Sequence, residues 1–299
     1  MKSNLIEKAL KIISDRRYDA ESFAQNNKTQ AFNDEKFKSV YLRYVGKMIN
    51  DARENIVDSD SLEKLKNQYE SRLKELKIEN IDPAYTCKKC SDTGFKDGKY
   101  CDCLIEELNK LLKQESGFLN LEDFDKADFE IFDNKDFMKK LYLVMKKWCH
   151  SNFDKNLVYI SGQTGVGKTH LMKCMANELI NQHKIVLLTT SFAMHQDFVK
   201  SYACRDAEEK QTILEKYLTA QVLFIDDLGT ELRQPNITVN YLYQVLNERK
   251  MNKKPTIITS NLNLDDIIDY YDERIFSRVA DKSSSICVYI EGDDLRLKR

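Results

Sequence analysis

The sequence has 299 residues, of which 42% are hydrophobic and 32% charged, a length that is long for one domain and suits two. Lysine and arginine (47) nearly balance aspartate and glutamate (48), which excludes bulk positive charge as a means of holding nucleic acid. With only nine glycines and three prolines, a fold of many strands and turns is excluded and a helix-rich chain is favoured.

The first 82 residues are predicted to be helical. Apolar residues recur every three or four positions in three stretches, over residues 5–13, 37–52 and 62–76. We expect Asp60 to cap the third helix, since Glu63 follows three residues later, and Pro83 to stop it. Apolar stripes usually pack together, so a helical bundle is expected, with its other faces left for a partner.

A cysteine-rich insert follows at residues 85–104. It gathers four of the eight cysteines within 17 residues: Cys87, Cys90, Cys101 and Cys103. Gly94 and Gly98 lie between the two pairs and allow a tight reversal of the chain. Four thiolates complete the tetrahedral shell of a structural Zn²⁺, whereas an iron–sulfur cluster or a redox pair is the alternative. Ordinary core or surface thiols are expected at Cys149, Cys174, Cys204 and Cys287.

Neither an export signal nor a membrane span is predicted. The first 18 residues alternate charged and apolar side chains, unlike the apolar centre of a secretory signal. No stretch of the chain approaches the run of apolar residues that a membrane span needs. We therefore expect a cytoplasmic protein without membrane contact, whose cysteines stay reduced.

The pattern changes after about residue 135 to an alternation of helices and short apolar strands. The strands are expected over residues 157–161, 185–189, 222–226, 256–260 and 285–290. This alternation predicts an α/β fold with a parallel sheet covered by helices on both faces. The acidic, phenylalanine-bearing stretch at 121–132 is expected to be a linker into this second domain.

Residues 162–169 read GQTGVGKT, a full match to the phosphate-binding pattern G-x-x-x-x-G-K-[ST], between a strand and an amphipathic helix. The glycines let backbone N–H groups converge on the phosphates of ATP, Lys168 neutralises the β and γ oxygens, and the Thr169 hydroxyl reaches Mg²⁺. We expect the nucleotide to be bound by Gly162, Gln163, Thr164, Gly165, Val166, Gly167, Lys168, Thr169 and His170.

Two further strands end in polar side chains. The strand over 221–229 ends in Asp226, expected to hold the Mg²⁺ shell, and Asp227, expected to act as a base or to orient water. Asn261 follows the next strand and is the candidate to orient the attacking water beside the γ-phosphate. The alternatives are a pair of aspartates that cap a turn and an asparagine in an Asx turn.

Four segments, in this order and over residues 120–299, resemble one family: GQTGVGKTH, LFIDDLG, TSN and DERIFSRV. They resemble the AAA+ ATPases of the bacterial replicative helicase-loader group (DnaC/DnaI-like), related to the initiator DnaA and to the IstB-like transposition helper ATPases. The resemblance implies a five-stranded parallel sheet in the order 5-1-4-3-2. Only nine residues follow the last predicted strand, too few for the usual helical lid, so a lidless P-loop core is expected.

The resemblance also implies roles for two arginines. Arg278, in the segment ERIFSR, would reach the γ-phosphate of a neighbouring subunit, which requires self-assembly through the AAA+ domain; Arg274 is the less favoured choice. Arg296, in GDDLR near the end of the chain, would act as the second sensor of the nucleotide. Solvated surface arginines are the alternative for Arg278 and Arg296.

The resemblance covers the cysteines as well, because related loaders carry a zinc-binding amino-terminal region that docks on the replicative helicase. Two domains are therefore expected: a helical partner-binding domain at 1–118, which contains the four-cysteine zinc module, and an AAA+ ATPase domain at 119–299. The favoured function is an ATP-dependent loader that binds a hexameric replicative DNA helicase and delivers it to single-stranded DNA in replication initiation.

Two other functions stay open. One is an IstB-like transposition helper, a class that generally lacks such a cysteine module, and the other is a nucleotide switch that hydrolyses ATP too slowly to drive cycles. Lys200, Arg205 and Arg233 are candidates to line a DNA path, with solvated side chains as the alternative.

Overall fold

The computed structural model describes residues 2–54, 58–116, 118 and 120–297. These form two compact units, one of Leu10–Cys103 and the other of Met1–Ala9 together with Leu104–Arg299. The domain boundary expected between 118 and 119 stays a prediction, because compactness alone does not show which segments fold independently. Within the described ranges, no helix is both long and apolar enough to cross a membrane.

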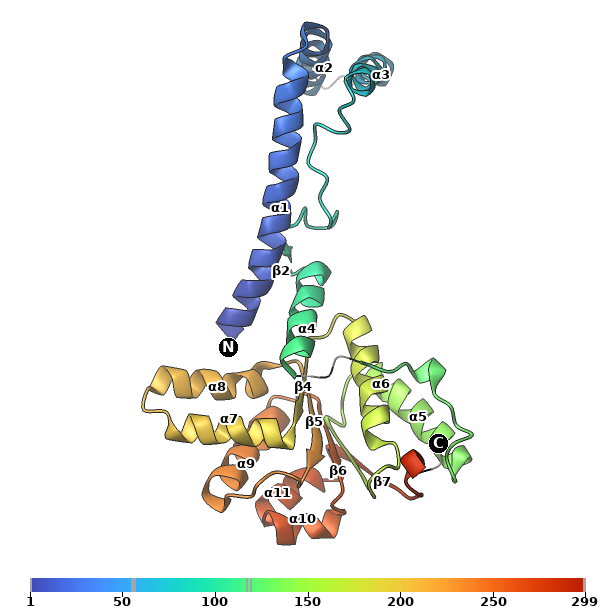
Figure 1. The fold of residues 1–299 in the computed structure, drawn as a ribbon, viewed down its shortest axis with the longest axis vertical. Helices are drawn as coiled ribbons and strands as arrows, with labels where there is room; N and C mark the ends of the chain where they lie inside the picture. Colours follow the sequence, from blue (N-terminus) through green and yellow to red (C-terminus); the bar gives the residue numbers. More distant parts are fainter. Residues whose placement is uncertain (1, 55–57, 117, 119, 298–299) are drawn as a thin grey trace. The chain divides into compact units, whose positions relative to one another are not determined.

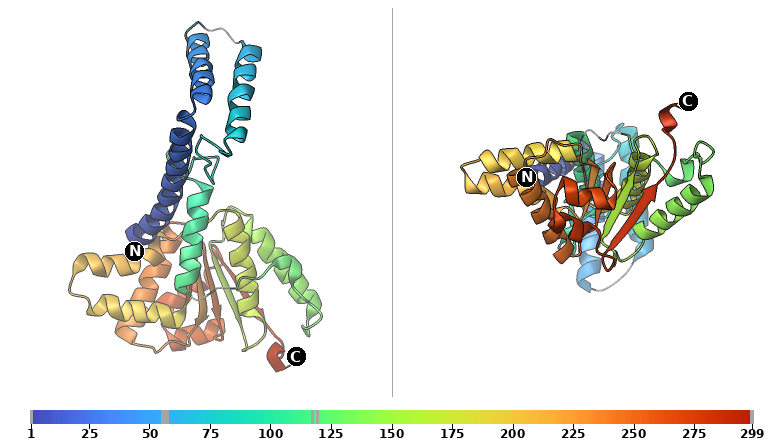
Figure 2. Two further views of the ribbon diagram at one scale, coloured as in Figure 1. Left: turned by 45° about the horizontal axis from the view of Figure 1, so that its top comes forward. Right: turned by 90° about the horizontal axis from the view of Figure 1, so that it is seen from below.

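The unit of Leu10–Cys103 contains the three predicted helices. They are α1 (Lys2–Phe32), which begins in the other unit, α2 (Glu35–Glu54) and α3 (Ser59–Glu75). Helices α2 and α3 lie side by side (Figures 1 and 2). Aromatic rings fill the space between them: Phe37 is fully buried, stacks on Tyr41 at 5.4 Å and meets Tyr69 edge-on at 6.3 Å. The apolar stripes over 37–52 and 62–76 therefore pack against each other as predicted, whereas the stripe over 5–13 contributes none of the described residues of this cluster.

An ion pair also joins these two helices. Asp34 precedes α2 and accepts hydrogen bonds from Nε and Nη2 of Arg72 on α3, at 2.9 and 2.6 Å, and from the backbone N–H of Phe37 at 2.7 Å. The hydrogen bonds from Arg72 lower the pKa of the Asp34 carboxyl to about 2. One carboxylate thus caps α2 and holds α3 against it.

The ends of α3 differ from the prediction. The capping residue is Asp58 and not Asp60, because the Asp58 side chain accepts the backbone N–H of Ser61 at 3.2 Å. The helix ends at Glu75, well before Pro83. Lys77 adopts the left-handed conformation, with φ of 57°, and this turn ends the helix before the proline can act.

The second unit contains a five-stranded parallel sheet. Its strands are β3 (Leu157–Gly162), β4 (Val186–Thr190), β5 (Val222–Leu228), β6 (Thr256–Ser260) and β7 (Ser285–Ile290). They lie in the order β4-β5-β6-β3-β7, and every neighbouring pair is parallel. Counted within this sheet the order is 5-1-4-3-2, which confirms the predicted α/β core.

Helices cover both faces of this sheet. Figures 1 and 2 show α5 (Lys135–Cys149) and α6 (Lys168–Asn181) on one face, with α9 (Asn240–Met251) and α11 (Glu273–Val279) on the other. Further α-helices of the unit are α4 (Asp102–Ser116), which begins in the other unit, α7 (Ser191–Ala203), α8 (Ala207–Thr219) and α10 (Leu264–Tyr270). Short 3-10 helices lie at Phe124–Lys126 and Leu295–Leu297. A π-helical turn, Pro235–Val239, leads into α9.

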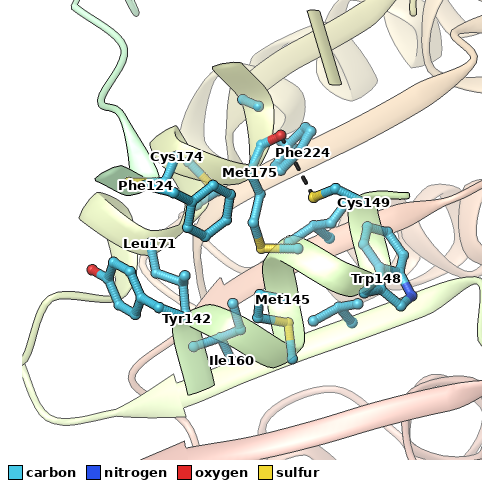
Figure 3. Close-up of a cluster of buried hydrophobic side chains, with 14 of the residues drawn as sticks. Phe124, Tyr142, Met145, Trp148, Cys149, Ile160, Leu171, Cys174, Met175 and Phe224 are labelled. Carbon is cyan, nitrogen blue, oxygen red and sulfur yellow. Dashed lines mark hydrogen bonds between the residues drawn. The ribbon is translucent and has the colours of Figure 1, made fainter. Parts of the chain in front are cut away.

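A hydrophobic core cluster lies between α5, α6 and the sheet (Figure 3). Phe124 and Phe129 belong to its edge and contact the Tyr142 ring at 5.9 and 5.1 Å. The expectation of a linker over 121–132 is therefore wrong: this stretch packs on the core of the second unit, because burying its aromatic side chains outweighs keeping the segment solvated.

Candidate active site and candidate metal centre

The phosphate-binding loop joins the end of β3 to the start of α6, as its motif predicts. Gly165 and Gly167 have φ of 83° and 94°, a region that other residues rarely adopt. A Cβ atom on Gly165 would lie 1.9 Å from Oδ1 of Asp294, so a larger residue there would have to displace the Asp294 side chain. The loop therefore closes tightly at the positive end of α6, where backbone N–H groups bind phosphate.

Lys168 is buried at the start of α6, with 5% of its surface exposed. Its ammonium group donates hydrogen bonds to the backbone oxygens of Gly162 and Gln163, at 2.8 and 2.7 Å, and to Oδ1 of Asn261 at 2.8 Å. Burial lowers the pKa of Lys168. The loop thus holds a partly desolvated cation, and such a cation interacts more strongly with phosphate than a solvated one.

A cavity of about 240 Å³ opens beside the loop. Its lining consists entirely of residues that the sequence predicted for the site: Thr164, Gly165, Gly167, Lys168, Thr169, His170, Asp227, Asn261 and Arg296. Gly162 and Gln163 contribute backbone oxygens to Lys168 instead, and the Val166 side chain is buried in the hydrophobic core. The structure thus brings segments from four parts of the chain to one polar cavity.

Asp226 lies behind this cavity, at the end of β5, and is 5% exposed. Its carboxylate oxygens accept the Thr169 hydroxyl at 3.1 and 3.2 Å and also the Thr259 hydroxyl. Burial raises the pKa of Asp226. A carboxylate and a hydroxyl that meet beside a phosphate loop are oxygen ligands of the kind that Mg²⁺ prefers, so these two side chains fit a magnesium site.

The neighbouring Asp227 lines the cavity itself. Its backbone has φ of 55°, in the left-handed region that is unusual for a residue in a strand. Its N–H donates to the Thr259 hydroxyl at 3.0 Å. Sequence reasoning gave Thr259 no role, although it stands in the quoted segment TSN; its two bonds to the aspartate pair are visible only in three dimensions.

The segment after β7 folds back onto the loop. The N–H of Leu295 donates to the backbone oxygen of Gly165 at 3.1 Å. Arg296 faces the cavity while its guanidinium is paired with the Asp294 carboxylate, at 2.9 Å through Nε and 2.7 Å through Nη2. A basic side chain therefore lies at the rim of the site, as predicted for Arg296.

His170 connects the loop to the core behind it. Its Nδ1 lies 2.8 Å from the Tyr142 hydroxyl, on α5. Burial raises the pKa of Tyr142, so the phenol stays protonated. Tyr142 fixes the ring of a residue that lines the cavity, and the sequence offered no signal for it beyond its place in an apolar stripe.

Arg278 is absent from the cavity lining of its own chain. Its Nε donates to Oδ1 of Asn247 at 2.9 Å and its Nη2 to the Tyr243 hydroxyl at 3.0 Å, both on α9. The guanidinium also lies 5.2 Å from the centre of the Tyr243 ring, as does that of Arg274. The structure does not bring Arg278 to the cavity, and its role across subunits stays a prediction.

The four clustered cysteines converge in the unit of Leu10–Cys103. All four Sγ atoms lie within 4.8 Å of one another; Cys87 and Cys101 are 3.8 Å apart, and Cys90 and Cys103 are 3.5 Å apart. Zinc–sulfur bonds of about 2.3 Å in a tetrahedron place sulfur atoms roughly 3.8 Å apart. The cysteine cluster therefore matches the shape of a four-thiolate metal centre.

Asp92 shapes the first half of this cluster. It is buried, and its carboxylate accepts the backbone N–H groups of Thr86 and Cys87 at 2.7 and 2.8 Å. The backbone around Cys87 is thereby held in place by a side chain outside the group of four candidate ligands. The spacing of the cysteines did not predict this role for Asp92, although the sequence shows an aspartate two positions after the first cysteine pair.

In this 5-1-4-3-2 sheet, the phosphate loop follows the first strand, two carboxylates lie near the end of the third strand, and an amide follows the fourth. This arrangement defines a P-loop ATPase of the AAA+ class. The chain is an ATPase of this class. The family model of the IstB-like ATP binding proteins matches residues 108–299, and the chain belongs to this family.

Several known proteins are similar in sequence. The uncharacterized protein YqaM of Bacillus subtilis is 30% identical over 225 residues, 71% of this chain and 69% of that protein. The phage-like element PBSX protein XkdC of Bacillus subtilis is 27% identical, over 70% of this chain and 83% of that protein. The replicative helicase loader DnaC of Escherichia coli is 28% identical over 148 residues, 48% of this chain and 58% of the loader.

Two solved structures are also similar to part of this chain. A crystal structure of the DnaC helicase loader is 22% identical, with a TM-score of 0.46, over 56% of this chain and 96% of that one. The DnaA structure from Aquifex aeolicus bound to AMPPCP is 23% identical, with a TM-score of 0.45, over 54% of this chain and 48% of that one.

Proposed function

We propose that this protein is an ATP-dependent loader that binds the hexameric replicative DNA helicase and delivers it to single-stranded DNA when replication begins. The observation that carries the proposal is the pairing of a complete phosphate site with a separate helical unit that gathers four cysteines. Relatives named as replicative helicase loaders support it. An ATPase that acts in DNA replication is expected to work in the cytoplasm.

The residues of the cavity take the following roles in this proposal. Lys168 and the loop N–H groups bind the β- and γ-phosphates, while Thr169 and Asp226 hold Mg²⁺. The metal supplies charge that stabilises the transferring phosphoryl group. Asp227 accepts a proton from the attacking water, and Asn261, bonded to Lys168, orients that water beside the γ-phosphate.

The proposal assigns partner binding to the amino-terminal part of the chain, residues 1–118, and ATP hydrolysis to residues 119–299. Zinc is the metal that best fits the cysteine cluster, because four thiolates close its tetrahedral shell and leave no position for a substrate. The zinc is therefore structural and holds the segment from Cys87 to Cys103 in shape for the helicase.

Self-assembly and DNA contact complete the proposal. Arg278 reaches a neighbouring subunit's nucleotide, since it is bonded to α9 and does not line the cavity of its own chain. Single-stranded DNA lies along the AAA+ assembly, with Lys200, Arg205 and Arg233 as candidate phosphate contacts.

The alternative is an IstB-like transposition helper, since the chain belongs to the family of IstB-like ATP binding proteins. The relatives named as replicative helicase loaders make it the less favoured choice. A direct comparison of partners separates the two. The full chain is mixed with the purified replicative helicase of its host or with a purified transposase, each with Mg-ATP, and complexes are measured by size-exclusion chromatography with light scattering. A stable complex with the helicase supports the loader; a complex with the transposase alone overturns it.

A further inference from the structure

The strand that carries the two aspartates is irregular where they lie. Strand β5 pairs with β6 in regular register up to Ile225, opposite Ile258, and resumes at Leu228, opposite Ser260. Between these points β5 has two residues, Asp226 and Asp227, and β6 has one, Thr259. An extra residue of this kind is a β-bulge, which bends a strand and redirects its side chains.

Thr259 fills the gap that the bulge opens in the hydrogen-bond ladder. It is fully buried, and its hydroxyl accepts the N–H of Asp227 at 3.0 Å and donates to the carboxylate of Asp226. The next residue closes the far side, since the Ser260 hydroxyl donates to the backbone oxygen of Leu228 at 2.6 Å. Two side-chain hydroxyls from β6 thus replace the ladder bonds that the extra residue displaces.

The direction of these bonds follows from simple counting. A hydroxyl has one proton to donate. The N–H of Asp227 can only donate, so the threonine oxygen accepts there and its single proton is directed at the Asp226 carboxylate. Asp226 also accepts the Thr169 hydroxyl, and both bonds favour its ionised form.

The bulge has a consequence for the geometry of the site. In a regular strand, two consecutive side chains point to opposite faces of the sheet, so only one aspartate could face the phosphate loop. Here Asp226 meets Thr169 while Asp227, with its left-handed backbone, lines the cavity. Thr259 touches both residues and is the one side chain among the described hydrogen bonds that links them.

We propose that Thr259 is a positioning residue for hydrolysis: its hydroxyl holds the bulge of β5 so that Asp226 binds Mg²⁺ and Asp227 faces the water. The inference rests on the metal and base roles proposed above for the two aspartates. Side chains that orient metal ligands in this way typically affect metal affinity roughly 10- to 100-fold when removed.

The test compares Thr259→Val, which keeps the shape and loses the hydroxyl, with Thr259→Ser, which keeps the hydroxyl. Mn²⁺ affinity in the presence of ATP is measured by electron paramagnetic resonance, and kcat is measured against Mg²⁺ concentration. Thr259→Val is expected to weaken metal affinity roughly 10-fold or more and to lower kcat, while Thr259→Ser stays within about 3-fold of the parent.

Two further variants separate the possible explanations. Thr189→Val removes another buried strand hydroxyl, on β4, and should leave metal affinity unchanged. Asp226→Asn tests the metal assignment itself. Should Thr259→Val fail to fold, Thr259→Cys takes its place, because a thiol is a weak donor and acceptor.

Two results would contradict the proposal in different ways. If Thr259→Val binds Mn²⁺ like the parent while Asp226→Asn does not, Thr259 has no positioning role but the metal site stands. If both variants bind Mn²⁺ like the parent, the assignment of Asp226 to the metal is wrong, and the proposal about Thr259 falls with it.

Discussion

The ammonium group of Lys168 lies 2.8 Å from the side-chain oxygen of Asn261, although 93 positions separate the two residues. Two backbone oxygens of the phosphate loop accept the other two ammonium protons. In the proposed mechanism, a phosphate that recruits the lysine replaces these partners, which leaves the Asn261 oxygen available to accept a hydrogen bond from water. In the proposed function, this contact links phosphate binding to the orientation of the attacking water.

Replacing Lys168 tests the first half of this link. Lys168→Ala removes the buried cation, so the affinity for ATP should fall by at least roughly 100-fold. The measurement is the fluorescence of a labelled ATP analogue. Asn261→Ala is the matched control, since it removes a partner of the lysine but no charge, and it should lower kcat much more than affinity. Equal affinity in the Lys168→Ala variant and the parent would show that the nucleotide binds elsewhere.

Replacing Asp226 should change stability and activity in opposite directions. Burial raises the pKa of this carboxyl, so the folded chain binds its proton more tightly than the unfolded chain. Between the ordinary and the raised pKa, stability falls as the pH rises, and above both values the ionised group costs folding free energy. Asp226→Asn removes that cost at pH 7.

We therefore expect Asp226→Asn, without nucleotide or metal, to raise the midpoint of thermal unfolding by about 2–4 °C, or about 1 kcal/mol. This gain should shrink as the pH is lowered and the parent carboxyl becomes protonated. The same variant should lose Mg²⁺-dependent hydrolysis while still binding ATP. Calorimetry that finds the variant less stable than the parent at pH 7 would mean that the ionised carboxylate is compensated by its two hydroxyl donors.

A mixing experiment tests the role of Arg278. Arg278→Ala should bind ATP like the parent but lose the rise in hydrolysis per chain that accompanies higher protein concentration. Mixed with Lys168→Ala, it should regain part of its turnover, because each variant supplies the half of the shared site that the other lacks. Arg274→Ala is the matched control. Turnover of the mixture that merely equals the average of the two variants would place Arg278 outside the reaction.

The cysteine cluster predicts about one zinc ion per chain, since four thiolates fill one tetrahedral shell. Cys90→Ser should release the metal and loosen the amino-terminal unit, and it should leave ATP affinity largely intact because the phosphate loop belongs to the other unit. Elemental analysis checks the metal. Cys204→Ser, outside the cysteine cluster, should retain it. Iron in place of zinc, with visible absorption, would instead indicate an iron–sulfur cluster.

Replacing Arg249, which does not line the cavity, is expected to lower the free energy of unfolding strongly. It is 1% exposed, and its guanidinium donates to the backbone oxygens of Tyr217, Ala220 and Pro255 and to the Thr256 hydroxyl. Lysine cannot reach four acceptors at once, so Arg249→Lys should cost about 3 kcal/mol. The exposed Arg205→Lys should stay within about 0.5 kcal/mol in the same unfolding experiment. If Arg249→Lys and Arg205→Lys changed the free energy of unfolding by similar amounts, water would have to replace the arginine as the hydrogen-bond donor to these backbone oxygens.

Local patterns predicted much of the fold and the cavity. The five strands are short apolar runs, and the phosphate loop is a contiguous motif, so both can be recognised without knowledge of distant contacts. The packing of the segment at 121–132 could not be predicted, because its phenylalanines are spaced irregularly and show no helix or strand period. Their burial depends on contacts with a core cluster formed by distant parts of the chain.

The bulge of β5 could not be predicted for a related reason. It depends on the hydroxyls of Thr259 and Ser260, more than 30 positions away, and no periodicity within β5 signals it. The wrong prediction that Asp60 caps α3 has a different cause. Asp58 and Asp60 have the same capping chemistry, and which of them caps α3 depends on where the helical backbone begins.

The central claim, that the chain loads a helicase, is tested most directly on circular single-stranded DNA, which a closed ring cannot enter from an end. The measurement is the number of replicative helicase hexamers that remain on the circles after gel filtration in the presence of the full chain and ATP. We predict loading that requires the chain and is lost with Lys168→Ala and with Cys90→Ser. Equal loading with and without the chain, at concentrations where it hydrolyses ATP, would contradict the account.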